Sequence, residues 1–297
     1  MSPVATPATE VTAVDRGDLP AGRESWPELP RRRPVRRRAR LLAIRSPISA
    51  RARVALTVGS VAVPLVAWFA LSASGTVSAV FLPSPVRVWT AGLDMASSGQ
   101  LATDTWASVQ RVLTGFGLAV AVSVPLGILM GSFQAGQAVL EPVIGLLRYL
   151  PASAFIPLLI IWLGLGEPSK VAILLIGTVF FNTLMTADAV RAVPGTLIDV
   201  SYTLGARRGE VLRKVVVPHA LPGMLDAIRV NAAAAWNFVV VAELINSESG
   251  LGYRIVRAGR FLQTDKIFAV LVVIGVIGLT MDIVLRVLRD QIGRWVP

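Results

Sequence analysis

Six stretches of this chain are long enough and apolar enough to cross a lipid bilayer, and they constrain the fold more than any other feature. A helix needs about 20 apolar residues to cross the hydrocarbon core of a membrane. The stretches cover residues 54–72, 109–130, 139–165, 171–190, 224–245 and 267–288. Charged residues make up 16% of the chain, against about 25% in a typical soluble domain. The predicted fold class is an all-α polytopic membrane protein with about six transmembrane helices.

The third stretch differs from the others because prolines interrupt it at positions 142, 151 and 157. Proline removes a backbone donor and clashes with the preceding turn of a helix. Broken helices are tolerated at membrane depth where the freed backbone is buried in protein or lines a cavity. We therefore expect a broken entry followed by a shorter span.

The basic residues divide the chain into two parts. Of the 29 lysines and arginines, twelve precede Val54, and seven of these lie between Arg31 and Arg40. Residues 1–53 are poor in large aliphatic side chains and are predicted to form a disordered tail, whereas residues 54–297 form the transmembrane domain. Basic residues flanking spans mark the cytoplasmic side, so both termini are predicted to be cytoplasmic. The tail is expected to touch membrane lipid and not nucleic acid.

Several classes of chemistry have no support in the sequence. The chain has no cysteine and a single histidine, His219, which argues against thiolate catalysis and a dedicated metal site. No P-loop of the form GxxxxGK[ST] and no HExxH motif is present. No catalytic residue, metal site or cofactor is assigned to this chain.

One polar segment interrupts the apolar pattern, between the fourth and fifth stretches. It lies in a predicted cytoplasmic loop of about residues 191–222. Asp199 and Ser201 suit a helix start, Gly205 offers a place for close approach, and Pro218 and Pro222 are expected to stop the helix and direct the chain into the fifth span. The amphipathic pattern by itself is equally compatible with an ordinary helix that lies at the membrane interface.

The spacing in this segment resembles the cytoplasmic loop of the membrane subunits of ATP-binding-cassette importers. That loop carries an acidic residue and two small residues, then a glycine, then two aliphatic residues and a proline at fixed intervals. The matching positions here are Asp199, Val200, Ser201, Gly205, Val215, Val217 and Pro218. Asp replaces the usual Glu and Val-Ser the usual Ala-Ala, which puts the first turn of the motif in doubt. From Phe81 to the C-terminus the chain also resembles permeases for nitrate, sulfonate, taurine and bicarbonate.

The resemblance implies a type I importer fold, with the loop acting as a coupling helix in a groove of a cytoplasmic ATPase. It further implies a homodimer, two ATPase subunits that hold ATP and magnesium, an extracytoplasmic substrate-binding protein and a plasma (inner) membrane location. The substrate is expected to be a small anion. The residues expected to contact or support the ATPase are Asp199, Ser201, Leu204, Gly205, Ala206, Arg207, Val215, Val217 and Pro218.

Polar residues inside the spans are candidates for the translocation pathway, because they are costly in a membrane. The residues singled out are Asn182, Asn231, Asn237 and Glu243. Helix-packing contacts are the alternative for the two asparagines of the fifth span. Asp226 and Arg229 are three residues apart and are predicted to pair.

Two other classes of function are compatible with a polytopic membrane protein. An ion-gradient-driven secondary transporter would show matching broken helices in an internal repeat, which the sequence does not display. A membrane-bound enzyme would need catalytic residues clustered near an interface. The spacing of the loop motif favours the importer subunit over both.

Overall fold

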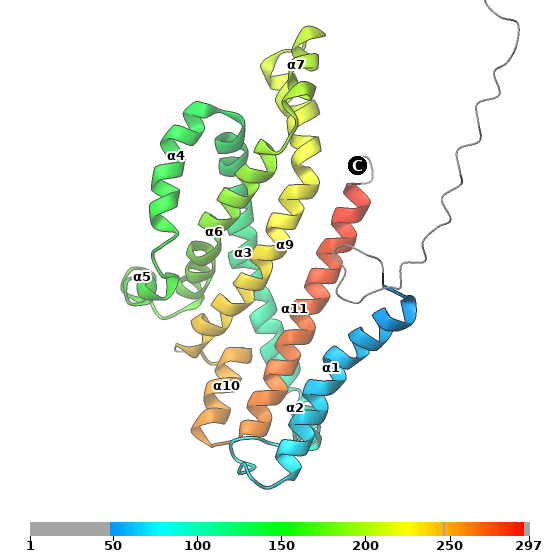
Figure 1. Cartoon of the computed structure of the whole chain (residues 1–297). Coiled ribbons are helices and arrows are strands. Elements are labelled where there is room, and N and C mark those ends of the chain that lie inside the picture. The colour runs from blue at the N-terminus through cyan, green and yellow to red at the C-terminus, as the bar shows by residue number, and fades with distance from the viewer. Residues whose placement is uncertain (1–47, 246, 294–297) are drawn as a thin grey trace, which may run out of the picture. The chain divides into compact units, whose positions relative to one another are not determined.

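The computed structural model describes residues 48–245 and 247–293, and every regular element in these ranges is a helix (Figure 1). The chain divides into two compact units, residues 1–61 and 62–297. The predicted N-terminal tail lies almost entirely outside the described residues. Helix α1 (Ala50–Ala73) begins before the division and ends after it. The remaining helices belong to the second unit, which confirms the predicted fold class.

Five helices among the described residues are long and apolar enough to cross a membrane, and each covers one of the predicted stretches to within one residue. They are α1, α3 (Gln100–Ser132), α6 (Glu167–Arg191), α9 (Val217–Leu244) and α11 (Thr264–Ile292). Two shorter helices that the hydropathy pattern did not predict are α2 (Pro85–Ser97) and α10 (Leu251–Arg260).

The third stretch forms a bent pair of helices, which makes a sixth span if the pair is taken as one. Helix α4 (Gln134–Leu147) is followed by the turn η1 (Ala152–Phe155) and by α5 (Ile156–Leu163), and the chain bends by 80° between the two arms. Pro151 lies at the bend and Pro157 in the first turn of α5, while Pro142 is accommodated inside α4. Helix α5 has 8 residues, which at 1.5 Å per residue is about 12 Å. The expected shorter span is therefore too short to cross a membrane by itself.

Helices α3 and α6 run parallel and pack unusually closely. Every fourth residue of α3 between positions 115 and 131 is small. These residues are Gly115, Ala119, Ser123, Gly127 and Gly131. A Cβ atom at three of these glycines would clash with Leu174, Thr186 and Val190 of α6. Ser123 faces Asn182, 59 residues later, and the glycine contacts keep the same separation. Small residues let two backbones approach in this way inside membranes.

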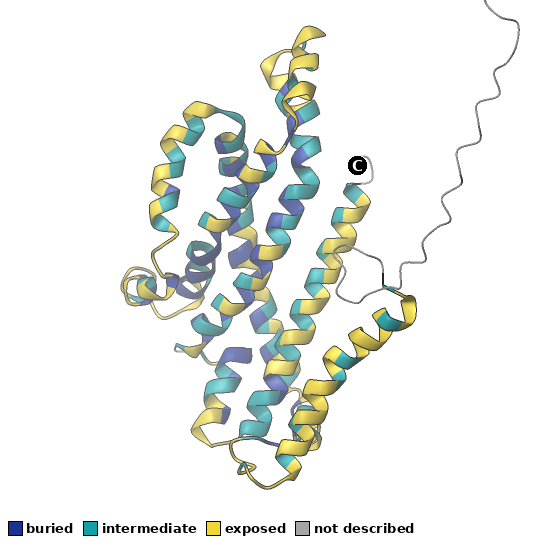
Figure 2. Cartoon of the chain, viewed as in Figure 1, coloured by how far each residue is buried: buried dark blue, intermediate teal, exposed yellow. Residues whose placement is uncertain are grey.

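The core of the unit lies between α3, α6 and α9, where most of the buried side chains gather (Figure 2). Gly177 of α6 faces the ring of Phe238 on α9, which continues the close packing. Helix α11 packs against α9 but exposes much of its apolar surface, including Leu271, Val276 and Leu279. A membrane protein exposes such surface to lipid tails or to another subunit.

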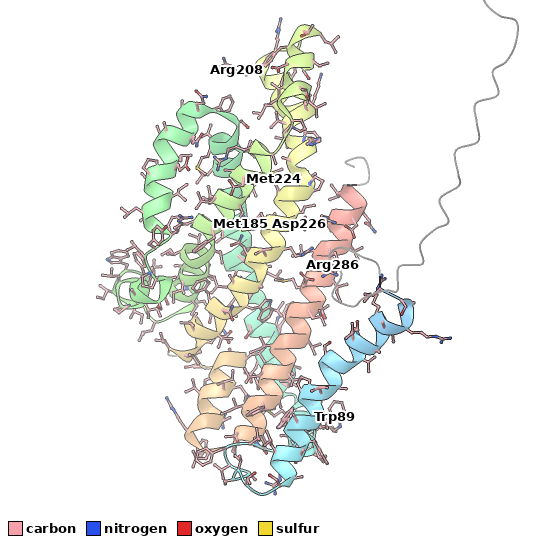
Figure 3. All side chains as sticks on the ribbon, viewed as in Figure 1. Trp89, Met185, Arg208, Met224, Asp226 and Arg286 are labelled. Atoms are coloured by element: carbon pink, nitrogen blue, oxygen red, sulfur yellow. The ribbon has the colours of Figure 1, made fainter. Side chains whose placement is uncertain are left out.

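Ion pairs join α9 and α11 at the end where α11 finishes. The predicted pair forms, with 3.2 Å between Arg229 Nη1 and Asp226 Oδ1. Arg229 also reaches Asp282 of α11 (2.9 Å), and Asp226 receives Arg289 (3.1 Å). Figure 3 shows Asp226 on α9 and Arg286 on the neighbouring α11. The pair predicted within one helix is thus part of a network between two.

Candidate functional site

The segment between α6 and α9 (residues 195–216, the α6–α9 segment) begins with a short helix, α7 (Gly195–Thr203). Its end has the hydrogen bonds of a Schellman cap. The N–H of Ala206 donates to the carbonyl of Ser201 (3.0 Å) and the N–H of Gly205 to that of Tyr202 (2.9 Å). Gly205 has φ +83°, a conformation that side chains with a Cβ rarely adopt. The glycine closes the helix and turns the chain.

One expectation about this helix needs correction. Asp199 and Ser201 do not start it, because α7 begins at Gly195 after Pro194. Ser201 instead donates its hydroxyl to the carbonyl of Leu197 within the helix (2.6 Å). A Cβ at Gly205 would meet nothing within 4 Å in this chain. Backbone conformation, and not close packing within the subunit, is the reason for this glycine.

The return to α9 is helical throughout, so Pro218 does not stop a helix as expected. Helix α8 (Arg208–Val211) leads into a π-helical turn, η2 (Leu212–Val216), and then directly into α9. Pro218 lies in the first turn of α9, and Pro222 lies inside that helix. A proline has no N–H to donate to the preceding turn, and π turns occur where the ordinary helical register is disturbed. The chain thus continues as one helical rod from Arg208 to Leu244.

Five of the predicted coupling residues meet in one surface hollow of about 340 Å³. They are Ser201, Leu204, Gly205, Ala206 and Val215. Glu210 lies beside them and pairs with Lys214 (3.2 Å). Its carboxylate also accepts the backbone N–H of Arg207 (3.0 Å). The other predicted residues, Asp199, Arg207, Val217 and Pro218, do not line this hollow.

Two of the three predicted pathway asparagines are buried between helices. Asn182 of α6 donates to Ser123 of α3 (2.5 Å), and Asn231 of α9 donates to Asn182 (3.4 Å) and to the carbonyl of Ala227 (2.9 Å). Met185 lies within 3.2 Å of the same Asn231 amide. These contacts join α3, α6 and α9 inside one subunit. This geometry agrees with a role of Asn182 and Asn231 in packing the helices together, the alternative to lining the pathway.

Asn237 is placed differently from the other two asparagines. Its side chain is exposed on α9, together with Val230, Ala233 and Leu244. Its amide makes one long hydrogen bond, 3.4 Å to the carbonyl of Ala233. An amide facing lipid tails would be costly. This face of α9 is therefore suited to water or another protein.

Glu243, at the far end of α9 from the α6–α9 segment, is fully enclosed by partners. Arg111 of α3 pairs with it at 2.7 Å, and Ser108 donates to the same carboxylate at 2.7 Å. Arg111 also pairs with Glu167 at the start of α6 (2.7 Å), which in turn binds Lys170 (3.0 Å). Buried charges such as those of Arg111 and Glu243 need partners of opposite charge. The four charged residues tie α3, α6 and α9 together.

The same cluster fixes the connection from α9 to α10. Three consecutive backbone N–H groups donate to side chains: Gly250 to Asp104 (3.0 Å), Leu251 to Ser108 (2.9 Å) and Gly252 to Glu243 (2.8 Å). Arg254 of α10 pairs with Asp104 at 2.6 Å. A Cβ at Gly250 would clash with Glu243 and Arg111. Apart from Glu243, the sequence interpretation missed this cluster, although Arg111 inside an apolar stretch was a visible signal.

Comparisons with known proteins agree with this architecture. Residues 123–296 match the family model described as binding-protein-dependent transport system inner membrane component. A probable ABC transporter permease protein of Brucella melitensis is 37% identical over 236 residues, which are 80% of this chain and 95% of that protein. The taurine transport system permease protein TauC of Escherichia coli is 35% identical over 263 residues, or 86% and 94% of the two chains.

A solved structure shares the fold at low sequence identity. An inward-facing structure of the MetNI methionine ABC transporter aligns with a TM-score of 0.55 at 19% identity, covering 65% of this chain and 97% of that one. The family match extends over more than half of the chain and includes the α6–α9 segment. This chain belongs to the binding-protein-dependent transport system inner membrane component family, as the multi-pass permease subunit of an ATP-binding-cassette importer.

Proposed function

We propose that the permease works as a pair of identical subunits with two ATP-binding-cassette ATPases and a separate extracytoplasmic binding protein. ATP and magnesium are held by the ATPases, and the permease itself is not catalytic. The cargo is a small sulfonate, such as the taurine named for the relative from Escherichia coli. Both termini and the α6–α9 segment lie on the cytoplasmic side in this arrangement.

The proposed ATPase contact rests on one observation. A large apolar side chain, Leu204, is exposed to solvent at the turn of the α6–α9 segment. Leu204 is 82% exposed, more than any other large apolar side chain in the part of the chain that the structure describes. Val200, four residues earlier on α7, is also exposed. An exposed apolar patch with a polar rim is typical of a protein contact. The adjoining hollow at Gly205 and Ala206 gives that contact a defined shape.

The segment is also built to transmit movement. The cap at Gly205 fixes the angle between α7 and α8, and α8 continues through the π turn into α9. A displacement applied at Leu204 would therefore reach the face of α9 that exposes Asn237. We assign the predicted coupling residues to this contact. Asn237 is the predicted pathway residue whose side chain faces out of the subunit.

The distribution of basic side chains supports the orientation. Arg207, Arg208 and Arg213 are exposed on the α6–α9 segment, as the cytoplasmic side requires. At the opposite end Arg254 is paired with Asp104 and is largely buried. One basic residue of that end is thus neutralised, whereas Arg257 and Arg260 of α10 stay exposed there.

A purification of the permease with its ATPase tests the proposal. Leu204→Glu places a charge in the proposed apolar contact and is expected to abolish co-purification of the ATPase in mild detergent, together with ATP-dependent taurine uptake by cells. Phe261→Glu is the matched control, since Phe261 is similarly exposed beside α10 at the other end of α9. It should retain the ATPase.

Three results would contradict the proposal in different ways. If Leu204→Glu retained the ATPase and normal uptake, the contact would be misplaced. If both variants lost the ATPase equally, the effect would be general misfolding and not a contact. If the wild-type complex formed but moved no sulfonate, the substrate class would be wrong while the coupling assignment stood.

A further inference from the structure

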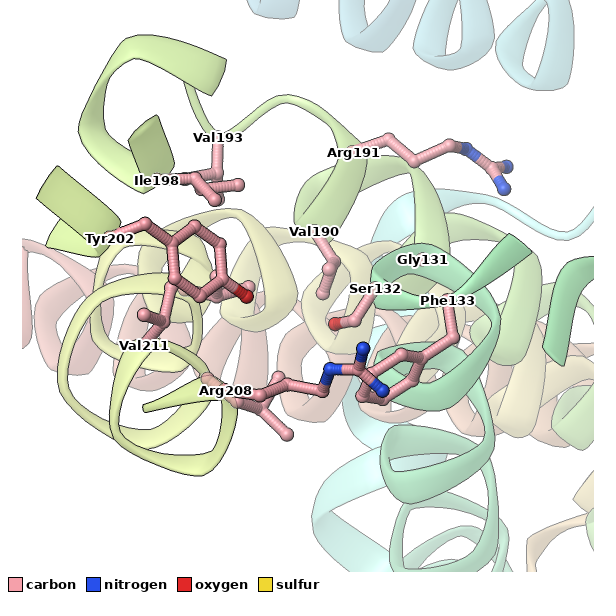
Figure 4. Close-up of a pocket in the computed structure, with 12 residues that line it drawn as sticks. Gly131, Ser132, Phe133, Val190, Arg191, Val193, Ile198, Tyr202, Arg208 and Val211 are labelled. Carbon is pink, nitrogen blue, oxygen red and sulfur yellow. The ribbon is translucent and has the colours of Figure 1, made fainter. Parts of the chain in front are cut away.

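A second cavity lies beside the α6–α9 segment, at the level where two spanning helices end. It has a volume of about 230 Å³ and is named here the interface pocket. Ser132 and Phe133 contribute from the junction of α3 and α4, Val190 from the end of α6, and Tyr202 and Arg208 from the α6–α9 segment (Figure 4). A water molecule occupies about 30 Å³ in the liquid. The pocket therefore has room for a group of several heavy atoms.

The charge in this pocket is positive and uncompensated. None of the twelve residues that line it is acidic. Arg208 makes no ion pair or side-chain hydrogen bond with any residue that the structure describes. Arg191, the other arginine of the lining, pairs with Asp188 at 2.7 Å and points away from the pocket centre in Figure 4. An unpaired guanidinium next to a cavity favours an anion with several oxygens.

Two hydroxyl groups lie at the same pocket without partners. The Ser132 hydroxyl is buried and has no hydrogen-bond partner within residues 48–245 and 247–293. The Tyr202 hydroxyl likewise finds none there, and in Figure 4 both oxygens are directed toward the space between their helices. A buried hydroxyl without a partner, such as that of Ser132, is uncommon because it costs free energy, whereas Tyr202 is 47% exposed. A bound oxyanion would accept hydrogen bonds from this side of the pocket.

The surroundings indicate where such an anion comes from. Helix α3 ends at Ser132 and α6 ends at Arg191, so the pocket lies where two spanning helices end, and lipid headgroups surround such helices at their ends. Val190, Val193 and Ile198 make the rest of the wall apolar. Basic pockets between spanning helices on the cytoplasmic side are suited to the phosphates of anionic lipids.

We propose that the interface pocket binds a phosphate group, supplied by an anionic phospholipid or by free inorganic phosphate, with Arg208 as its main charge partner. Tyr202 donates a hydrogen bond, and Ser132 supplies a second donor from the α3–α4 junction. A phosphate held there bridges the α6–α9 segment to the end of α3. The site is distinct from the hollow at Leu204, and the proposal does not depend on the ATPase contact.

Thermal unfolding of the purified full-length chain tests this site. Wild-type protein is compared in detergent with and without inorganic phosphate, and in nanodiscs of phosphatidylcholine with and without phosphatidylglycerol. Binding to the folded state should raise Tm by roughly 2–5 °C at saturation. Arg208→Gln should weaken the apparent affinity about 10- to 100-fold and Tyr202→Phe about 3- to 10-fold, as expected for loss of a charged and a neutral hydrogen bond.

Arg213→Gln is the matched control, because it removes the same charge from an exposed side chain of the segment that does not line the pocket. Phosphate also stabilises proteins in general, and this effect should be equal in all variants. A response to both probes that Arg208→Gln abolishes supports a phosphate site open to free anion. A response to phosphatidylglycerol alone, again lost in Arg208→Gln, supports a lipid headgroup site.

Other outcomes would overturn the assignment. If Arg208→Gln and Tyr202→Phe responded like wild type, the pocket would bind no phosphate. An equal loss in Arg208→Gln and Arg213→Gln would reduce the effect to general attraction by a basic surface. Should Arg208→Gln fail to fold, Tyr202→Phe keeps the charge and still tests the pocket.

Discussion

At the residue scale, the roles of several side chains depend on neighbours that are distant in the sequence. Glu243 is a predicted pathway residue. In the structure its carboxylate accepts hydrogen bonds from Arg111, Ser108 and the N–H of Gly252. Its position suits a structural link between α3, α9 and the start of α10. The proposed role in transport stays a prediction, and any such role acts through this link.

Removing one partner of this buried pair should destabilise the protein strongly. Arg111→Met leaves Glu243 and Glu167 without their main cation, at a cost of about 3–5 kcal/mol. Adding Glu243→Gln to it should recover part of the loss, so that the two changes are not additive. Thermal unfolding in detergent measures both effects.

An exposed ion pair provides the control for that experiment. Arg286 pairs with Asp282 at 2.8 Å, and its side chain is 55% exposed. Arg286→Met should therefore cost no more than about 1 kcal/mol. A loss of the same size in Arg111→Met and Arg286→Met would contradict the importance given to the buried cluster.

At the element scale, the contact between α3 and α6 depends on the size of side chains and not on their polarity. Glycine at 115, 127 and 131 allows the two helices to pack at a constant register. No hydrophobic force drives helices together inside a membrane, so close packing supplies the attraction. This contact holds the ends of both helices at the interface pocket and beside the α6–α9 segment.

Replacing one of these glycines by a residue with a branched side chain should weaken the contact between α3 and α6. Gly127→Val would drive its side chain into Thr186 and the carbonyl of Thr183, and overpacking of this kind costs about 1–3 kcal/mol. Gly117→Val, on the same helix, meets nothing within 4 Å and is the control. Thermal unfolding should separate the two variants by several degrees. Equal midpoints would show that α3 and α6 can separate without loss of stability.

At the scale of the whole molecule, the exposed face of α9 is where the proposed second subunit would pack. Asn237 lies on an exposed face of α9 with Ala233, a small residue that permits close approach. The proposed pathway runs along this face between two copies. The buried asparagines, Asn182 and Asn231, support the helix from behind.

Asn237→Leu therefore tests transport separately from assembly. We expect the ATPase to co-purify normally and taurine uptake to fall about 5- to 10-fold, the size expected when one hydrogen-bonding group is lost. Val230→Leu changes the same face without removing a polar group and should leave uptake near wild type. Unchanged uptake in Asn237→Leu would place this face against lipid and remove the residue from the pathway.

Hydropathy and motif spacing determined much of this protein from the sequence alone. Long apolar stretches can only be helices in a membrane, because every backbone group must find its partner within the segment. The five long helices follow the predicted stretches, and the glycine register of the α6–α9 segment pointed to the importer family. Helical spans and motif spacing depend on residues that are close in the sequence, so both can be predicted from the sequence.

Tertiary structure decided the rest, because contacts between distant residues leave no local pattern. Pro218 looked like a helix stop, but the π turn before it lets the helix continue. Asp104, Arg111 and Arg254 looked unrelated in the sequence and form one buried cluster with Glu243. The interface pocket likewise exists because the ends of α3 and α6 lie beside the α6–α9 segment. Spacing along the chain determines helices, whereas only packing determines which of their side chains meet.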